Sequence, residues 1–427
     1  DKNSPYRIES AILYVLTQKA INFGHVYYPK EKLTNEVSKL IGVEKELIEP
    51  VYMNLLLSSE VVIDNSFEES NVYLDYLYVS ESYIASKLAK MALNDDFKIL
   101  FDIEKEIKEA IKSLSIKLSK IQIDAIKSCF EENISIITGG PGTGKTTIIN
   151  TISKIYLDNG YNISLCAPTG RAAKRIEETT GIEAKTIHRM LGYIPSSYDD
   201  IGHFEYNEDN PLDTDVIIID EMSMVGEHLF AFAVDAVLNS PSTRIVLLGD
   251  TDQLAPVSRG DVLRDLIECG VIKTVRLDVN YRQGSTSTIT DASIKIRENR
   301  AYSGMTRNLK FDDEFNFISV TDPDEKTEAD KIMKSIVEEY RKGVAQYGMQ
   351  GTIVLTPTHY DKGTPTGYLC KNRVNVEIQA AVNPKTDGKP FYGVNHQTFM
   401  AGDRVIQRKN NEEVIHGAPG HVTATIK

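Results

Sequence analysis

One short segment, ISIITGGPGTGKTTIIN at residues 134–150, constrains the fold of this chain more than any other. A short and mostly apolar strand runs into a glycine-rich turn, and a helical stretch begins near Lys145. A strand, a glycine loop and a helix in this order predict a helix that packs against a sheet. The glycines allow backbone N–H groups to surround an anion at the start of that helix.

The spacing Gly139-x-x-x-x-Gly144-Lys145-Thr146 is the full phosphate-binding loop pattern of nucleoside triphosphatases. We expect Lys145 to neutralise the β- and γ-phosphates and Thr146 to hold Mg²⁺. The other loop residues expected at the nucleotide are Gly140, Pro141, Gly142, Thr143, Gly144 and Thr147. The alternative is a chance glycine turn, which the strand, loop and helix together disfavour.

From residue 134 onward, short apolar runs alternate with helical stretches. This rhythm predicts an α/β fold, with a parallel sheet covered by helices on both faces. The expected strands lie in ISII, NISLCAP, DVIIID, RIVLLGD, TVRLDVN and TIVLTP. Ligands of such sheets bind beyond the carboxyl ends of the strands, so the polar residues that follow each run are the candidates for function.

Three such residues suit ATP-type chemistry. Asp220 suits a magnesium ligand, and Glu221 suits the group that orients and deprotonates the attacking water. Gln253 lies three residues beyond Asp250, and its amide can both donate and accept a hydrogen bond at the γ-phosphate. The alternatives are a solvated acidic strand end for the two acids and a surface turn for Gln253.

The segment NYRQ adds Tyr281 and Arg282. Tyr281 could stack on a nucleotide base. Arg282, if it comes from a second domain, could stabilise the charge of the transition state and make domain closure depend on ATP. Each residue alone is better explained as a core tyrosine and a surface arginine.

The first hundred residues have a different character. Helical apolar spacing occurs at residues 6–20 and 31–41, and a longer helical stretch is expected at about 80–117. The runs EVVIDN and NVYLDYLYV predict a short hairpin between them. We interpret residues 1–100 as a small, mostly helical domain of winged-helix type.

Composition narrows the function classes. The chain has 427 residues, 41% of them apolar, with a net charge of −13. No apolar run reaches the ~20 residues of a membrane span, and the first residues do not resemble a signal peptide. The acidic balance argues against a protein that coats nucleic acid, but it allows a local groove of amides, hydroxyls and a few cations. Scattered cysteines without a C-x-x-C pair predict a reducing cytoplasm, without zinc or disulfides: Cys129, Cys166, Cys269 and Cys370.

The motifs in their order resemble the RecD-like DNA helicases of superfamily 1B, in the long form with an N-terminal extension. The resemblance covers about residues 8–410 and rests on GGPGTGKTT, APTGRAAKRI, TIHRMLGY, IIIDEMSMV, LLGDTDQLAPVSRGDVLRDL, NYRQ, LTPT and GDRVIQ. The pairing of Gly-Asp-x-x-Gln-Leu with Asn-Tyr-Arg-Gln separates this pattern from transporters, GTPases and kinases that share only the phosphate-binding loop.

The resemblance implies an enzyme that hydrolyses ATP, with Mg²⁺, and moves 5′-to-3′ on single-stranded DNA. It implies two RecA-like motor domains with ATP between them. We assign the first to residues 101–278, with a hairpin insertion at about 193–210 that could split a duplex. The second, incomplete in this chain, is assigned to residues 279–427, with the start of a small inserted barrel at about 385–427. Single-stranded DNA, junctions with duplex DNA and other DNA-processing proteins are the expected partners, and a membrane is not.

The resemblance also gives single residues a role. Gln122 falls on the glutamine that reads adenine, Tyr281 near the base-stacking position, and Arg282 on the arginine finger. Positions expected along the DNA strand are Thr169, Arg171, Thr186, His188 and Thr356. Such hydroxyls and cations suit phosphate contacts that carry no sequence information. For His188 a purely structural role is the alternative.

The chain departs from the family pattern in three places. Met222 stands where the family usually has alanine in D-E-A-S, and IHGAPGHVTATIK replaces the expected N-G-D-x-G strand. The later H-K-x-Q-G and T-R-A motifs are absent from the sequence, which predicts a fragment of a longer protein or one with pieces omitted. An RNA helicase, a translocase that strips proteins, and a non-hydrolysing DNA-binding scaffold are the alternative functions. The pathway and the oligomeric state stay open.

Overall fold

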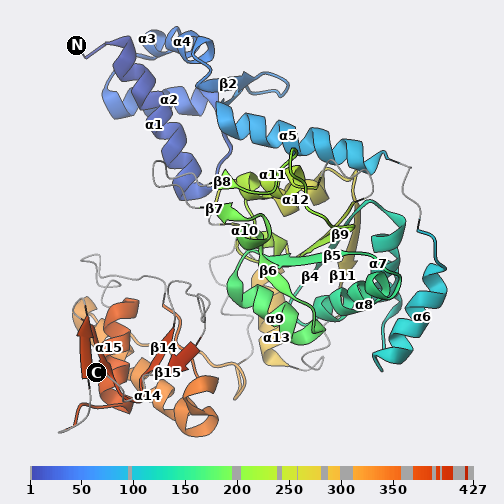
Figure 1. Ribbon diagram of the computed structural model, residues 1–427. Coiled ribbons are helices and arrows are strands. Elements are labelled where there is room, and N and C mark those ends of the chain that lie inside the picture. The colour runs from blue at the N-terminus through green and yellow to red at the C-terminus, as the bar shows by residue number, and fades with distance from the viewer. Residues whose placement is uncertain are drawn as a thin grey trace. The chain divides into compact units, whose positions relative to one another are not determined.

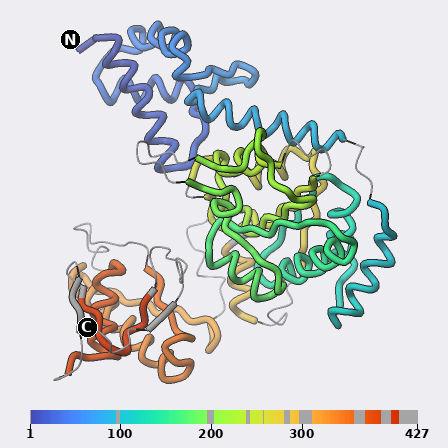
Figure 2. Tube along the Cα trace, in the orientation of Figure 1, coloured from blue at the N-terminus to red at the C-terminus, as the bar shows by residue number. Residues whose placement is uncertain are grey.

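The computed structural model describes residues 2–94, 99–194, 203–237, 243–256, 258–279, 287–298, 311–356, 369–386, 391–394, 397–406 and 419–421 (Figures 1 and 2). The chain divides into two compact units, residues 1–290 and residues 291–427, and each is described by itself. Among the described residues, the structure holds no helix with the length and apolar character needed to cross a membrane.

Unit 1 begins with a small domain of helices and a three-stranded antiparallel sheet. Its strand order is β1-β3-β2, and Tyr73 of β3 lies opposite Tyr27 on one side and Val62 on the other. This order, with helices between the first two strands, is that of a winged helix. The elements are α1 (Pro5–Phe23), β1 (Tyr27–Pro29), α2 (Lys30–Ile41), α3 (Lys45–Ile48), α4 (Val51–Leu57), β2 (Val61–Asp64) and β3 (Asn71–Leu74).

The helical stretch that follows differs from the prediction at both ends. Figure 2 follows the chain into α5 (Asp75–Ala92), which begins where β3 ends, so the expected strand segment DYLYV is helical instead. Leu74 is the last residue of β3 that pairs with β2. From Leu77 onward the buried residues follow the spacing of a helix, with Ile84 and Leu88 on the same buried face. The predicted single helix at 80–117 is also wrong. A second helix, α6 (Ile103–Ser113), starts anew at Asp102, whose carboxylate accepts the Lys105 amide at 3.1 Å.

A six-stranded, fully parallel sheet forms the centre of unit 1, which confirms the predicted α/β class (Figure 1). Its order is β11-β4-β10-β9-β5-β6. The parallel pairings align β4 between β10 and β11, and β9 between β10 and β5. The strands are β4 (Ile134–Gly139), β5 (Ile163–Ala167), β6 (Ala184–Thr186), β9 (Val216–Ile219), β10 (Arg244–Gly249) and β11 (Lys273–Leu277).

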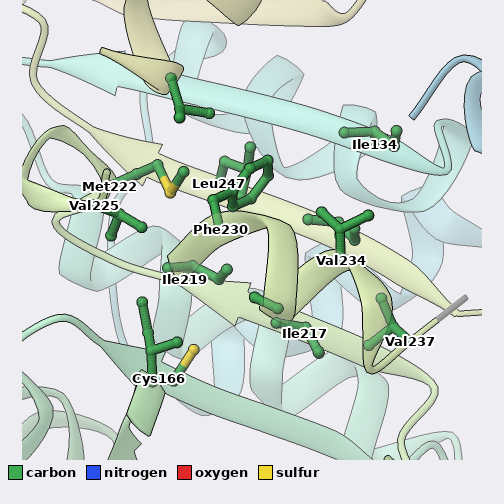
Figure 3. Packing of buried hydrophobic residues seen from close by; sticks show 14 of the residues in the cluster. Ile134, Cys166, Ile217, Ile219, Met222, Val225, Phe230, Val234, Val237 and Leu247 are labelled. Carbon is green, nitrogen blue, oxygen red and sulfur yellow. The ribbon is translucent and has the colours of Figure 1, made fainter. Parts of the chain in front are cut away.

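Alternating side chains build a core on each face of this sheet. On β9, Val216 and Ile218 face a core shared with α6, α7 (Lys120–Glu131), α8 (Lys145–Asp158) and α9 (Gly170–Thr180). On the same strand, Ile217 and Ile219 face the opposite core, where Figure 3 shows them beside Phe230 and Val234. That core is covered by α11 (Glu227–Asp235), α12 (Val262–Glu268) and α5. Helices therefore cover both faces, and the carboxyl ends of the strands share one edge.

Three short elements complete this part of unit 1: α10 (Ile187–Met190), the antiparallel pair β7 (Tyr193–Ile194) and β8 (His203–Phe204), and the 3₁₀ turn η1 (Met222–Met224). The pair β7–β8 lies within the range 193–210 in which the sequence predicts a hairpin. Its intervening residues lie outside the described part of the chain.

Helix α13 (Thr288–Glu298) spans the boundary of the two units. Unit 2 then contains α14 (Glu325–Gly351), which bends at Gly348 where φ is 73°, and α15 (Lys371–Val382). Two antiparallel pairs follow, β12 (Phe391–Val394) with β13 (Gln397–Met400) and β14 (Arg404–Ile406) with β15 (Pro419–His421). The strand predicted at TIVLTP is absent from its described residues, 352–356. The Thr352 carbonyl there accepts the Arg404 side chain at 2.8 Å and not a neighbouring strand.

Candidate functional site

The loop between β4 and α8 is shaped by close contacts that exclude larger side chains. A Cβ on Gly139 would lie 2.9 Å from both the Cβ and the carbonyl oxygen of Leu277. Gly144 has φ 92°, a conformation that residues with a Cβ rarely adopt, and it turns the chain into α8. The Thr143 hydroxyl donates to the Gly140 carbonyl at 2.9 Å and closes the loop. The glycines at these positions are therefore required by geometry.

The start of α8 is suited to phosphate. Its N-cap is Gly144, which has no side chain to cap the first helical amides, so these N–H groups and the helix dipole can serve an anion. The Lys145 ammonium donates to the carbonyls of Gly139 and Gly140. Burial lowers the pKa of Lys145, while the nearby carboxylates of Asp250 and Asp220 act in the opposite direction.

Gln122 is hydrogen-bonded to the phosphate-binding loop. Its side chain is 4% exposed, its Oε1 accepts the Ser119 amide at 2.9 Å, and its Nε2 donates to the Thr143 carbonyl at 3.1 Å. The bond from the Ser119 amide, together with the bond from the Gln122 backbone amide to the Ser119 hydroxyl, forms a capping box at the start of α7. Gln122 thus ties α7 to the phosphate-binding loop, and its contact with adenine stays a prediction.

The acidic pair lies just beyond β9. Asp220 is buried, and its Oδ1 accepts the Glu221 amide at 2.8 Å. Burial raises the pKa of Asp220 to about 6, and the adjacent Glu221 carboxylate raises it too. Glu221 has φ 53° and ψ 39°, a left-handed conformation that costs an L-residue roughly 1–2 kcal/mol. Such strain is concentrated at functional sites.

Two further groups follow β10. Asp250 is 3% exposed, and its carboxylate accepts the Asp252 amide at 3.0 Å. The backbone amide of Gln253 donates to the Asp250 carbonyl at 3.1 Å and forms a tight turn. The Gln253 side chain is exposed. The turn therefore presents Gln253 at the same edge of the sheet as the acidic pair.

One cavity of about 470 Å³ gathers most of these groups, and its lining comes from segments that follow four neighbouring strands. Six of the lining residues are among those predicted from the sequence: Thr146, Thr169, Arg171, Asp220, Glu221 and Gln253. Four are not: Ala172, Arg175, Ile176 and Met224. Of these four, only Arg175 carries a charge. Its spacing of four residues from Arg171 could have indicated, from the sequence, that both arginines lie on the same face of a helix.

Two of the strand-contact candidates, Thr169 of the cavity lining and Thr186, also cap helices. The hydroxyls of Thr169 and Thr186 cap α9 and α10, accepting the amides of Ala172 at 3.2 Å and Arg189 at 3.3 Å. Because Ala167 pairs with Thr186, both threonines lie at the carboxyl edge of adjacent strands. Their contacts with DNA stay predictions.

His188 contacts the base of the β7–β8 pair. Its ring lies 5.5 Å from that of Tyr193, edge to face, and 6.0 Å from that of Phe204. Partial burial lowers the pKa of His188. These ring contacts fit the structural alternative for His188, and its contact with DNA stays a prediction.

Three candidates belong elsewhere in the chain. Thr356 lies in unit 2, and Tyr281 and Arg282 lie outside the described residues. Met222, the departure from the family pattern, is fully buried in the core beside Val225 and away from the cavity lining (Figure 3).

The donor set of the site fits magnesium. Mg²⁺ takes hard oxygen ligands and commonly binds through one or two protein groups together with substrate phosphates and water. The Thr146 hydroxyl and the Asp220 carboxylate line the cavity and are of this type. Within the described ranges, no group of three or more His, Cys, Asp and Glu side chains could hold a metal alone.

Comparisons with known proteins bear on the identity of this chain. A family model described as an AAA domain matches residues 117–321. The ATP-dependent RecD2 DNA helicase of Deinococcus radiodurans is 28% identical over 445 residues, covering 98% of this chain and 55% of that protein. The RecBCD enzyme subunit RecD of Mycolicibacterium smegmatis is 37% identical over 186 residues, covering 38% of this chain and 33% of that protein.

Among solved structures, the Pif1 helicase from Candida albicans is 20% identical and covers 72% of this chain and 69% of its own, with a TM-score of 0.39 that is too low to support a fold assignment. The chain spans 55% or less of the length of the two curated relatives. The match to the first of them nevertheless runs through nearly the whole chain, N-terminal domain included. In its sequence, this chain is similar to the RecD2 DNA helicase and to the RecD subunit of the RecBCD enzyme.

Proposed function

We propose that this chain is the ATP-hydrolysing part of a DNA helicase that moves 5′-to-3′ along single-stranded DNA and separates duplexes. The observation that carries the proposal is the shared cavity. Thr146, Asp220 and Glu221, which suit ATP hydrolysis, line it together with Thr169 and Arg171, which suit contact with a DNA strand. The names of the two curated relatives, an ATP-dependent DNA helicase and a RecBCD subunit, support the same activity and DNA as the partner.

In this proposal the loop amides and Lys145 bind the phosphates of ATP, while Thr146 and Asp220 would hold Mg²⁺. The ion supplies positive charge to the phosphates when it is bound. Glu221 orients a water molecule and takes its proton as the water oxygen bonds to the γ-phosphorus, and ADP leaves with the electrons of the broken bond. The strained backbone of Glu221 supports this role, because such strain is concentrated at functional sites.

Movement along DNA requires that a second domain change its position in response to ATP hydrolysis. We propose residues 101–278 and 279–427 as the two motor domains, after the winged-helix domain of residues 1–100. Gln253 would sense the γ-phosphate from the first domain and Arg282 from the second. Because an arginine finger contributes about 10³–10⁵ in rate, domain closure and hydrolysis would be coupled. Four free cysteines support a reducing cytoplasm as the location.

Strand displacement tests this proposal. The full-length protein is given a duplex with a 5′ single-stranded tail, the same duplex with a 3′ tail, and a blunt duplex, each with ATP and Mg²⁺. We expect displacement of the 5′-tailed duplex alone, and none by Lys145→Ala, because that variant lacks the ammonium group proposed to bind the phosphates of ATP.

RNA tails of the same sequence separate the alternatives. Displacement that is faster on RNA tails would favour an RNA helicase. ATP-driven movement that removes a bound protein without separating strands would favour a stripping translocase. Tight DNA binding by a protein that hydrolyses no ATP would identify a scaffold, and each of these three results would contradict the proposal.

A further inference from the structure

Helix α9 presents two arginines to the cavity. Arg171 and Arg175 are four residues apart, so they lie on the same face of the helix, and both line the cavity with Thr146 and Glu221. The opposite face of α9 is apolar, and its Ala173 side chain is buried in the core beneath the sheet. The apolar face anchors the helix, and the cationic face is directed at the candidate hydrolysis site.

Neither guanidinium forms an ion pair with a carboxylate in the described part of the chain, although buried Asp220 lines the same cavity. A guanidinium offers five N–H donors in a planar fork that matches phosphate oxygens. Two unpaired guanidinium groups around a cavity beside a phosphate-binding loop therefore favour an anionic ligand.

The two arginines differ in their place on α9. Arg171 is the second residue of the helix, two positions after the capping Thr169, and it is the candidate contact for a DNA strand. Arg175 lies one turn further along, and it lines the cavity with Thr146, Asp220 and Glu221, the residues proposed to act at the terminal phosphate.

We propose that Arg175 binds the γ-phosphate of ATP from within the first motor domain, and holds the free phosphate in the cavity after hydrolysis. The proposal rests on the proposed function in that it takes the loop at 139–146 as the ATP site. Arg175 would donate hydrogen bonds and add positive charge, with no transfer of its own proton. The volume of about 470 Å³ is within the range of small-ligand pockets, roughly 300–1,000 Å³.

This contact would also connect nucleotide and strand. Thr169, a candidate contact for the DNA strand, caps the same helix by accepting the Ala172 amide. A displacement of Arg175 on loss of phosphate would therefore be transmitted along α9 to Thr169. Loss of the γ-phosphate would release one end of a short rigid element whose other end faces DNA. Arg175 therefore offers a route from hydrolysis to strand grip that needs no residue of the second domain.

Equilibrium binding tests the proposal without requiring turnover. Affinities for ATPγS and for ADP, both with Mg²⁺, are measured by calorimetry on the full-length protein and on Arg175→Ala, Arg175→Lys and Lys174→Ala. Arg175→Ala should weaken ATPγS binding by roughly 10- to 100-fold, the worth of a charge-assisted hydrogen bond, and change ADP binding by less than about 2-fold. Arg175→Lys should recover part of the loss. The matched control Lys174→Ala, at an exposed cation of the same helix outside the cavity lining, should bind both nucleotides like the parent.

Inorganic phosphate provides the second readout. Phosphate should compete with ATPγS in the parent protein and at least about 10-fold more weakly in Arg175→Ala. Equal losses for ATPγS and ADP, or an unchanged preference for ATPγS, would overturn the proposal. If the parent shows this arginine-dependent preference but no DNA-stimulated hydrolysis, the proposed function fails and the Arg175 contact stands. A parent protein that binds neither nucleotide would overturn both.

Discussion

Glu227, the first residue of α11, is a buried acid without a counter-ion. Its side chain is 4% exposed, and its Oε1 has no hydrogen-bond partner among the described residues. Glu81 of α5 and Asp265 of α12 face it with like charge. Burial first, and these two carboxylates second, raise the pKa of Glu227 from its ordinary value of 4.5 to about 8. The folded protein therefore holds Glu227 protonated at neutral pH.

This shift makes the stability of unit 1 dependent on pH. Between pH 4.5 and 8 the folded state keeps a proton that the unfolded chain has lost, so stability falls as the pH rises through this window. Glu227→Gln, which mimics the protonated acid, should therefore raise the melting temperature by about 3 °C or more at pH 9. At pH 4, where the acid is largely neutral in both the folded and the unfolded state, the melting temperature should change by less than about 1 °C.

Thermal denaturation followed by circular dichroism at both pH values measures this difference. Glu131→Gln, at an exposed carboxylate on α7, is the matched control and should show no pH-dependent gain. An equal change in melting temperature at pH 4 and pH 9 would show that folding does not raise the pKa of Glu227.

The residue scale also shows how far the sequence can predict a site. The sequence alone suggests four of the proposed site residues, because each follows a predicted strand at the spacing of a known motif. These residues are Lys145, Thr146, Asp220 and Glu221. Arg175 could not be singled out, since its importance depends on which face of α9 meets the cavity. The hydrogen bond from the Gln122 side-chain amide to the Thr143 carbonyl could not be predicted either, because it joins residues 21 positions apart in the chain.

At the scale of elements, the buried strands of the parallel sheet in unit 1 were predicted well, whereas the strands expected at DYLYV and TIVLTP and the helix boundaries were not. Apolar runs of four to six residues mark buried parallel strands, and β4, β9 and β10 are buried along their whole length. The break between α5 and α6 was missed because apolar spacing continues through it. Its capping residue, Asp102, was the available signal.

The entry into α8 makes an element-scale prediction. Gly144 and Gly160 have similar left-handed backbones, φ 92° and φ 81°, but a Cβ on Gly144 would collide with Gln122 Nε2, whereas Gly160 faces open space. Gly160→Ala should therefore cost only the backbone strain, roughly 1–2 kcal/mol. Gly144→Ala should cost more and should weaken ATP binding at least about 10-fold, because the loop must shift.

Chemical denaturation and calorimetry with ATP measure the two effects, with Gly160→Ala as the control for strain. The double variant Gly144→Ala/Gln122→Ala should be more stable than the sum of its single changes predicts, since the collision has been removed. Strict additivity, or equal losses for Gly144→Ala and Gly160→Ala, would rule out the steric explanation.

At the scale of the molecule, the N-terminal domain is joined to the segment that follows Gln253. The Gly260 amide donates to the Gly24 carbonyl at 3.1 Å, and the Arg259 guanidinium lies 5.3 Å from the centre of the Tyr76 ring. Both contacts lie within unit 1. The N-terminal domain therefore contacts the segment that follows the turn carrying the proposed phosphate sensor, a link between distant segments that no sequence motif reveals.

The central claim of this account is that the cavity at the carboxyl edge of the unit 1 sheet hydrolyses ATP in response to DNA. Steady-state hydrolysis of ATP by the full-length protein, with and without an unstructured single-stranded oligonucleotide, tests it most directly, with Glu221→Gln measured in parallel. We predict hydrolysis that single-stranded DNA accelerates, and a Glu221→Gln variant that binds ATP normally but turns over roughly 10²–10⁴-fold more slowly, as a lost general base implies. Hydrolysis that is indifferent to DNA, or a Glu221→Gln variant with full turnover and weakened ATP binding, would contradict the account.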